Sequence, residues 1–248
     1  MRDSHTLRFL GVKWFSPIAL ILASCQPKLD VPVANPNPSN SSAPLVSSPE
    51  ISPKVVTLIN RLKNPSVKDR ATAVFYLGTL RLSSRSAVSH LIPLLKDPSP
   101  EVRSNVVHSL ANIIESKDTV VSYILPLISD KNINVRIATI GALGNIRASD
   151  QFTIPNIMSC LKDTNPQVRA TAAGALVNMG PLAKAAIPQL TQLLKDPNSE
   201  VRSNAVLALG SMKEFAANTV PAIMPLLKDN DSDVRSSADR ALKYIRKS

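Results

Sequence analysis

Between about residues 53 and 246, apolar residues recur at spacings of three and four, which is typical of amphipathic helices. The apolar runs come in pairs; in the fifth pair they span residues 187–194 and 201–212. Only a few residues separate the two runs of a pair, so the two predicted helices must pack antiparallel. The pattern therefore predicts a series of helical hairpins.

The hairpin pattern repeats with a fixed period of 33 residues. Its clearest marker is one arginine per unit: Arg70, Arg103, Arg136, Arg169, Arg202 and Arg235. A second column stands six residues before the arginines: Asn64, Asp97, Asp130, Asp163, Asp196 and Asp229. A strict period of this size indicates stacked, identical supersecondary units. We therefore predict an all-α solenoid of six two-helix repeats, wound as a right-handed superhelix.

A third column contains residues that favour helix N-caps. Four residues before the arginines stand Ser66, Ser99, Asn132, Asn165, Asn198 and Asp231. The side-chain oxygen of such a residue can accept a hydrogen bond from a backbone N–H of the first helical turn. The second helix of each unit is thus predicted to begin just after its cap.

Residues 93–98 with 101–103, and residues 193–197 with 200–202, resemble the repeats of the HEAT family. The similarity is greatest to the short-repeat branch first associated with phycobilisome (bilin) lyases, and it covers about residues 53–246. In that family the repeated aspartate and arginine form a hydrogen-bonded ladder between stacked units. The resemblance implies this structural role for Asp97, Arg103, Asp130, Arg136, Asp163, Arg169, Asp196, Arg202, Asp229 and Arg235.

The first 52 residues follow a different pattern. Arg2, Arg8 and Lys13 precede an apolar stretch, as in a secretory signal, and the segment Leu22-Ala23-Ser24-Cys25 resembles a bacterial lipobox. We expect a signal peptide over 1–24 and lipidation of Cys25; an ordinary secretory signal is the alternative. Residues 25–52 are rich in Pro, Ser and Asn, which favours a disordered tether before a solenoid over 53–248. The protein is thus expected on the extracytoplasmic side of a membrane, and Gln26 favours the outer membrane.

The composition indicates a basic protein with few candidates for catalytic or metal-binding residues. The formal net charge of +11 falls to about +9 without residues 1–24, and the predicted export argues against a nucleic-acid partner. Cys160 replaces a leucine of its column, so it is predicted to be a buried hydrophobe. His90 and His108 have no acidic neighbour at metal-ligand spacing, unlike the iron-binding His-Glu pairs of the HEAT-repeat enzyme deoxyhypusine hydroxylase. We expect no metal, no cofactor and no catalytic residues.

A surface is then the remaining candidate for function. Outward positions of the second helices are expected two, five and nine residues after each arginine, on the concave side. The candidate partner-binding residues in these columns are Asn105, His108, Asn112, Asn145, Thr171, Asn178 and Asn204. Two alternatives stay open at this point. The asparagines could bond only to neighbouring loops and helix ends, and the protein could be an enzyme or chromophore handler related to the bilin lyases. The leading expectation is a non-enzymatic, lipid-tethered scaffold that binds another protein.

Overall fold

A computed structural model describes residues 52–147 and 152–246. The predicted signal peptide, Cys25 and nearly all of the predicted tether lie outside these ranges. Within the described part the chain forms α-helices and 3₁₀-helices and no strand. The second helices of the hairpins are α2 (Val67–Thr79), α4 (Pro100–Ile113), α6 (Ile133–Asn145), α8 (Pro166–Met179), α10 (Ser199–Ser211) and α12 (Ser232–Arg246).

The first helices are shorter than the second helices. They are α1 (Pro53–Arg61), α3 (Val88–Leu91), α5 (Lys117–Ile124), α7 (Thr153–Cys160), α9 (Ile187–Leu193) and α11 (Val220–Ile223). Six 3₁₀-helices complete the described part: η1 (Arg81–Ala87), η2 (Ile92–Lys96), η3 (Leu125–Ser129), η4 (Gly180–Ala186), η5 (Lys213–Thr219) and η6 (Met224–Lys228).

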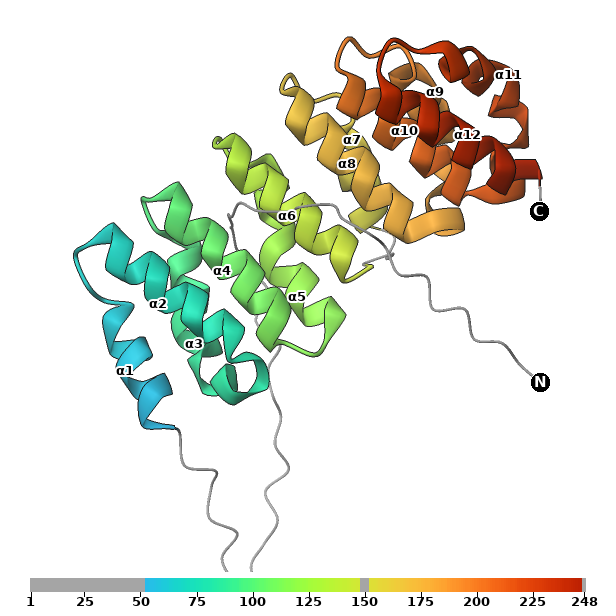
Figure 1. Ribbon diagram of the computed structural model, residues 1–248. Coiled ribbons are helices and arrows are strands. Elements are labelled where there is room, and N and C mark those ends of the chain that lie inside the picture. The colour runs from blue at the N-terminus through green and yellow to red at the C-terminus, as the bar shows by residue number, and fades with distance from the viewer. Residues whose placement is uncertain (1–51, 148–151, 247–248) are drawn as a thin grey trace, which may run out of the picture.

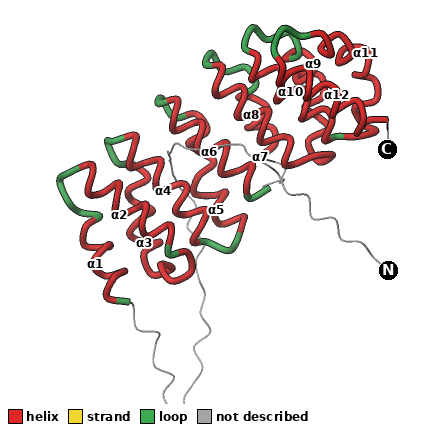
Figure 2. The backbone as a smooth tube through the Cα atoms, viewed as in Figure 1, coloured by secondary structure: helices red, strands yellow, loops and turns green. Residues whose placement is uncertain are grey.

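The six hairpins stack in sequence order, as the 33-residue period predicts. Figure 1 shows the second helices as one row that runs the length of the molecule, with the first helices in a second row alongside them. The backbone trace in Figure 2 shows the short turns that join the helices of each hairpin. Successive second helices pack directly on one another, from α2 on α4 to α10 on α12. The predicted all-α solenoid is confirmed.

Three first helices change to 3₁₀ geometry before the hairpin turn, which the apolar pattern did not indicate. Pro93, Pro126 and Pro225 lie at the beginning of η2, η3 and η6, respectively. A proline inside a helix lacks the backbone N–H and crowds the preceding turn. The chain therefore continues as a tighter helix into the turn that carries the aspartate.

The predicted caps form on five of the six second helices. The side chains of Ser66, Asn132, Asn165, Asn198 and Asp231 accept hydrogen bonds from backbone N–H groups of the first turn. Ser99 makes no such bond, but α4 still begins at Pro100, directly after it, as predicted. Pro100 at the first helical position does not account for the difference, because α8 also begins with a proline, Pro166, and is capped by Asn165.

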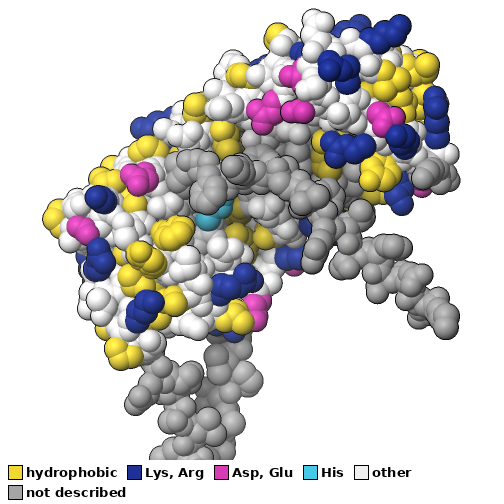
Figure 3. Space-filling model, in the orientation of Figure 1, with side chains coloured by type: hydrophobic (Ala, Val, Ile, Leu, Met, Phe, Trp, Pro, Cys, Tyr) yellow, Lys and Arg dark blue, Asp and Glu magenta, His cyan; other side chains and the backbone are white. Residues whose placement is uncertain are grey.

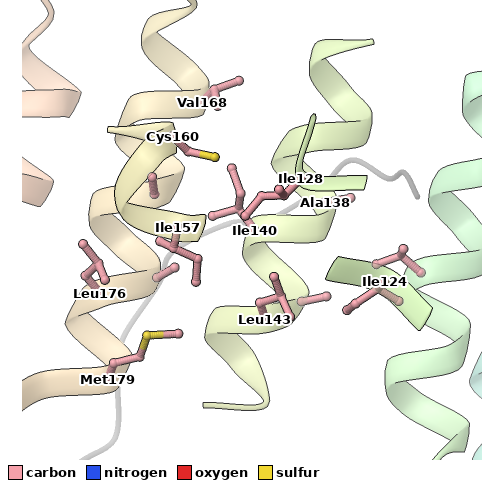
Figure 4. Close-up of a cluster of buried hydrophobic side chains, with 14 of the residues drawn as sticks. Ile124, Ile128, Ala138, Ile140, Leu143, Ile157, Cys160, Val168, Leu176 and Met179 are labelled. Carbon is pink, nitrogen blue, oxygen red and sulfur yellow. The ribbon is translucent and has the colours of Figure 1, made fainter. Parts of the chain in front are cut away.

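The core lies between the two layers of helices and is almost entirely aliphatic. The leucine seven residues after each arginine is buried in all six hairpins: Leu77, Leu110, Leu143, Leu176, Leu209 and Leu242. Figure 4 shows Cys160 among aliphatic side chains such as Ile140 and Ile157. Burial raises the pKa of the Cys160 thiol to about 11, so the thiol is neutral at physiological pH. Cys160 is thus a core residue, as predicted.

None of the helices in the described ranges is long and apolar enough to cross a membrane.

Candidate binding face and the arginine ladder

The repeated arginines connect each hairpin to the next one. Arg169 donates from Nε to Oδ2 of Asp196 at 2.8 Å and from Nη2 to Oδ1 at 3.0 Å. Its Nη1 donates to the backbone oxygens of Asp163 and Thr164, at 2.8 and 3.1 Å, in the turn of its own hairpin. One guanidinium therefore holds two successive turns together, and both side chains of the pair are largely buried.

The same two-bond contact joins every pair of successive hairpins. The other four pairs are Arg70–Asp97, Arg103–Asp130, Arg136–Asp163 and Arg202–Asp229, with N–O distances between 2.7 and 3.1 Å. Each aspartate lies 27 residues after its arginine, in the next hairpin. These ten residues form what we call the ladder. Arg70 belongs to it, although the family resemblance had been applied only from Asp97 onward.

Each ladder aspartate also shapes its own turn. One carboxylate oxygen of Asp196 accepts the backbone N–H of Asn198 at 2.9 Å, and Asn64 makes the equivalent contact with Ser66. No hairpin precedes the first one in the described part, so no arginine faces Asn64. A neutral amide is sufficient there, because it forms the turn without a charge to balance. At the other end, Arg235 donates to the backbone oxygens of Asp229 and Asn230 and to no carboxylate of the described residues. Arg235 was expected in the ladder and does not complete a pair.

The ladder lowers the pKa of two of its aspartates, Asp196 and Asp229. Hydrogen bonds from the Arg202 side chain hold the pKa of Asp229 below its usual range. For Asp196, burial acts in the opposite direction, but the bonds from Arg169 and from the N–H of Asn198 outweigh it, and the pKa is also lowered. Both carboxylates are therefore charged at neutral pH and act as acceptors for the guanidinium groups.

These lowered pKa values predict acid sensitivity. The stabilisation from a lowered pKa is complete above the unfolded value of about 3.9 and is lost as the pH falls through the folded value. In urea titrations from about pH 6 to about pH 2, the wild-type protein should lose more stability than Asp229→Asn, and the two curves should converge at the acidic end. Parallel curves would contradict a role of the charged carboxylate.

The column two residues after the arginines does not face solvent, so that part of the predicted surface is wrong. The side-chain amide of Asn105 donates to the backbone oxygen of Ala71, and that of Asn204 donates to the oxygen of Ala170, both at 3.1 Å. Thr171 is buried and donates to Gln167 of its own helix. The two asparagines of this column thus tie α4 to α2 and α10 to α8. The open alternative named neighbouring loops and helix ends; Asn105 and Asn204 instead bond to backbone oxygens within the neighbouring second helices.

Helix geometry explains the error. Spacings of three and four define which residues share a face, but they do not state which face meets the neighbouring hairpin. In this stack, the positions two and six residues after the arginine contact the preceding second helix. Ser109, for example, donates to the backbone oxygen of Val74 at 2.8 Å. The outward positions are those five and nine residues after the arginine.

We call these outward positions the second-helix face. It comprises Phe75, His108, Gly141, Gly174, Leu207 and Arg240 in one column and Thr79, Asn112, Asn145, Asn178, Ser211 and Tyr244 in the other. Asn112 and Asn145 are exposed, whereas His108 and Asn178 are half-buried. A β-carbon added to Gly141 would meet nothing within 4 Å, so this part of the face is open. No side-chain hydrogen bond engages the amides of Asn112 and Asn145 in the described part of the chain.

A second set of small residues, which the sequence analysis did not single out, controls how closely the hairpins stack. Gly78, Gly144 and Gly210 stand eight residues after an arginine and face Ser109, Ala175 and Ala241 of the next hairpin. A β-carbon on Gly144 would lie 2.7 Å from Cβ of Ala175, which is too close for any real contact. The signal was present as small residues at matched positions of successive units.

Within the described ranges, no three His, Cys, Asp or Glu side chains lie together as possible metal ligands. The ladder carboxylates are already engaged by guanidinium groups and backbone N–H groups.

Stacked helical hairpins with an internal polar ladder define an α-solenoid of the armadillo and HEAT class. A family model described as HEAT repeats matches residues 55–125, 121–193 and 154–243. These segments span nearly the whole solenoid, and the chain belongs to the HEAT-repeat family. No curated protein sequence matches it.

Solved structures with a similar fold include several designed proteins. An engineered protein is 24% identical, with 78% of this chain and 96% of its own covered and a TM-score of 0.56. A designed armadillo repeat protein in complex with the peptide (KR)4 is 21% identical, covers 77% and 99%, and has a TM-score of 0.57. The complex of CpcE and CpcF of phycocyanin lyase from Nostoc sp. PCC7120 is 22% identical, covers 85% and 71%, and has a TM-score of 0.43. At these identities, the first two similarities show a shared fold.

Proposed function

We propose that this protein is a non-enzymatic scaffold that binds an extended segment of another protein on its second-helix face. The observation that carries the proposal is the exposed amide pair Asn112 and Asn145, beside the open position at Gly141. An asparagine side chain offers both a donor and an acceptor, so it can bond to the backbone of an extended segment whatever its sequence. The peptide held by the designed armadillo protein is a precedent for such a ligand on this fold.

We propose that Cys25 carries the lipid and that residues 26–52 link it to the solenoid on the extracytoplasmic side of a bacterial membrane. Such a tether would let the solenoid search for partners near the membrane surface. Mass spectrometry of the mature protein tests this part directly: cleavage before Cys25 and added acyl mass support it, and an unmodified N-terminal Cys25 or an intact residue 1 contradicts it.

A substitution that adds charge and bulk at the centre of the second-helix face tests the proposed binding site. Asn145→Arg should leave the thermal midpoint within a few degrees, because the side chain is exposed, and should reduce capture of the partner about tenfold or more. The measurement is crosslinking of the full chain in native membranes followed by mass spectrometry of its neighbours. Ser122→Arg is the matched control, since Ser122 is exposed on α5, the first helix of the same hairpin.

The outcomes separate the possible functions. Loss of one specific neighbour with Asn145→Arg but not with Ser122→Arg supports the scaffold. Equal capture by both variants would remove the second-helix face from consideration. Visible absorbance of the purified protein would instead support a chromophore-handling activity.

A further inference from the structure

Each internal junction between hairpins has two features. The first is a guanidinium group that donates two hydrogen bonds to the carboxylate of the next hairpin. Arg202, for example, donates to Asp229 at 2.7 and 2.9 Å. The second is an aliphatic side chain two residues before the ladder aspartate, which is buried in each hairpin that another hairpin follows. In the fifth hairpin this side chain is Leu194, and it is 4% exposed. Together they join a charged contact to an apolar one at the same place in every junction.

At the last hairpin both features are uncovered. Arg235 donates from Nη1 to the backbone oxygens of Asp229 and Asn230, at 2.7 and 2.9 Å, and these bonds fix the guanidinium in place. Its Nε and Nη2, which hold the carboxylate in the other hairpins, meet no acceptor among the residues that the structure describes. The Nε and Nη2 donors of Arg235 are thus already oriented as in the arginines that bind an aspartate elsewhere in the stack.

The aliphatic position beside this arginine is open as well. Leu227, the equivalent of Leu194, is 41% exposed, and Met224 in the same segment η6 is 49% exposed. Leu227 stands two residues before Asp229, whose backbone oxygen holds Arg235, so the apolar and charged features adjoin. Figure 3 shows hydrophobic side chains gathered at this end of the molecule, with Lys and Arg side chains around them.

The second helix of the last hairpin, α12, in contrast lacks the surface on which a further hairpin would pack. Asp239 stands where the preceding hairpin has Val206, and Lys243 stands where it has Gly210. The two charged side chains pair with each other on the outer side of α12. A further HEAT hairpin therefore cannot pack on α12 as α12 packs on α10, where Gly210 lies against Ala241. The uncovered surface of the last hairpin is therefore limited to η6 and Arg235.

The opposite end of this chain does not fit that opening. Asn64 supplies an amide where a carboxylate is required, and the exposed aromatic ring of Tyr76 occupies a position that is Ser or Ala in the later hairpins. A second copy stacked head to tail would therefore leave the guanidinium without its anion. The occupant that fits the opening better is a segment of a different protein.

We propose that Arg235, Leu227 and Met224 form a docking site for a partner segment that carries an aspartate or glutamate close to an aliphatic side chain. Each of the five internal junctions pairs an arginine with a carboxylate of the next hairpin, and Arg235 presents the same donor groups without such a partner in the described residues. A carboxylate fits the planar donor pair of arginine through two parallel hydrogen bonds, while the aliphatic neighbour covers Leu227. The site is separate from the second-helix face, so either proposal can fail without the other.

The probe is a synthetic peptide with the sequence of residues 193–200, blocked at both ends, which places two leucines shortly before the ladder aspartate Asp196. It is titrated into the ¹⁵N-labelled full chain while the Nε–H resonance of Arg235 is followed by NMR. Arg235→Lys assigns that resonance by removing it. The peptide should shift the Arg235 resonance, and its Asp196→Asn version should bind about tenfold more weakly, because bonds between two charged groups are the stronger ones.

Two variants test the apolar part and its specificity. Leu227→Ser should weaken peptide binding about tenfold, and the fold should persist because the side chain is already half exposed. Leu182→Ser is the matched control, since Leu182 is an exposed leucine on η4. An Arg235 resonance that does not move, equal binding of the two peptides, or an equal effect of both leucine variants would each overturn the proposal.

Discussion

Replacing Arg169 with alanine should lower the free energy of unfolding by about 3–5 kcal/mol, the usual result when one member of a buried ion pair is removed. Four hydrogen bonds are lost, two to Asp196 and two to the turn of its own hairpin. The Asp196 carboxylate, itself 6% exposed, is then left without its cation. Urea denaturation followed by circular dichroism measures the loss.

The control for this substitution is an arginine outside the ladder. Arg85 makes an ion pair with Glu115 at 3.6 Å, but its side chain is 71% exposed. Exposed pairs of this kind contribute less than about 1 kcal/mol, so Arg85→Ala should change the midpoint little. If Arg169→Ala and Arg85→Ala behaved alike, the internal position of Arg169 would have no energetic consequence.

The second large effect is expected at the glycines of α6. Gly144→Ala should destabilise the protein by about 1–3 kcal/mol, because the new methyl group would overlap with Ala175 unless α6 and α8 separate. Gly141→Ala lies one turn earlier on the same helix, where the added methyl group meets nothing. It should stabilise the protein by up to about 1 kcal/mol through helix propensity alone.

The two glycine variants control for each other, since they make the same chemical change in one helix. Thermal and urea midpoints of both variants should move in opposite directions. A loss of equal size at both positions would mean that helix flexibility, rather than close packing between hairpins, determines the glycine requirement.

The repeat architecture was predictable because one period carried several independent signals. The arginine, aspartate, cap and leucine columns all had the same 33-residue spacing, and each has a separate physical reason to recur. Such agreement leaves few alternative folds. The same reasoning explains Cys160, which occupied a leucine column and is buried.

The surface was harder to predict because it depends on how neighbouring helices are placed. A period identifies equivalent positions, but the direction of a column depends on the packing between hairpins. Asn105 and Asn112 are both asparagines on α4; the first bonds to the preceding helix, whereas the second is exposed. Nothing in the local sequence distinguishes them. The sequence also did not predict that Arg235 would lack a carboxylate partner, because the arginine column continues to Arg235 without a change in residue type.

The central claim is that the arginine and aspartate columns are internal connections between successive hairpins. A double-mutant cycle with Arg169→Ala, Asp196→Ala and the combined variant, measured by urea denaturation, tests it most directly. Coupling of about 2 kcal/mol or more is expected, so that the second substitution costs much less once the first is present. Additive losses, with no coupling, would show that the two side chains do not act as a pair and would contradict the ladder.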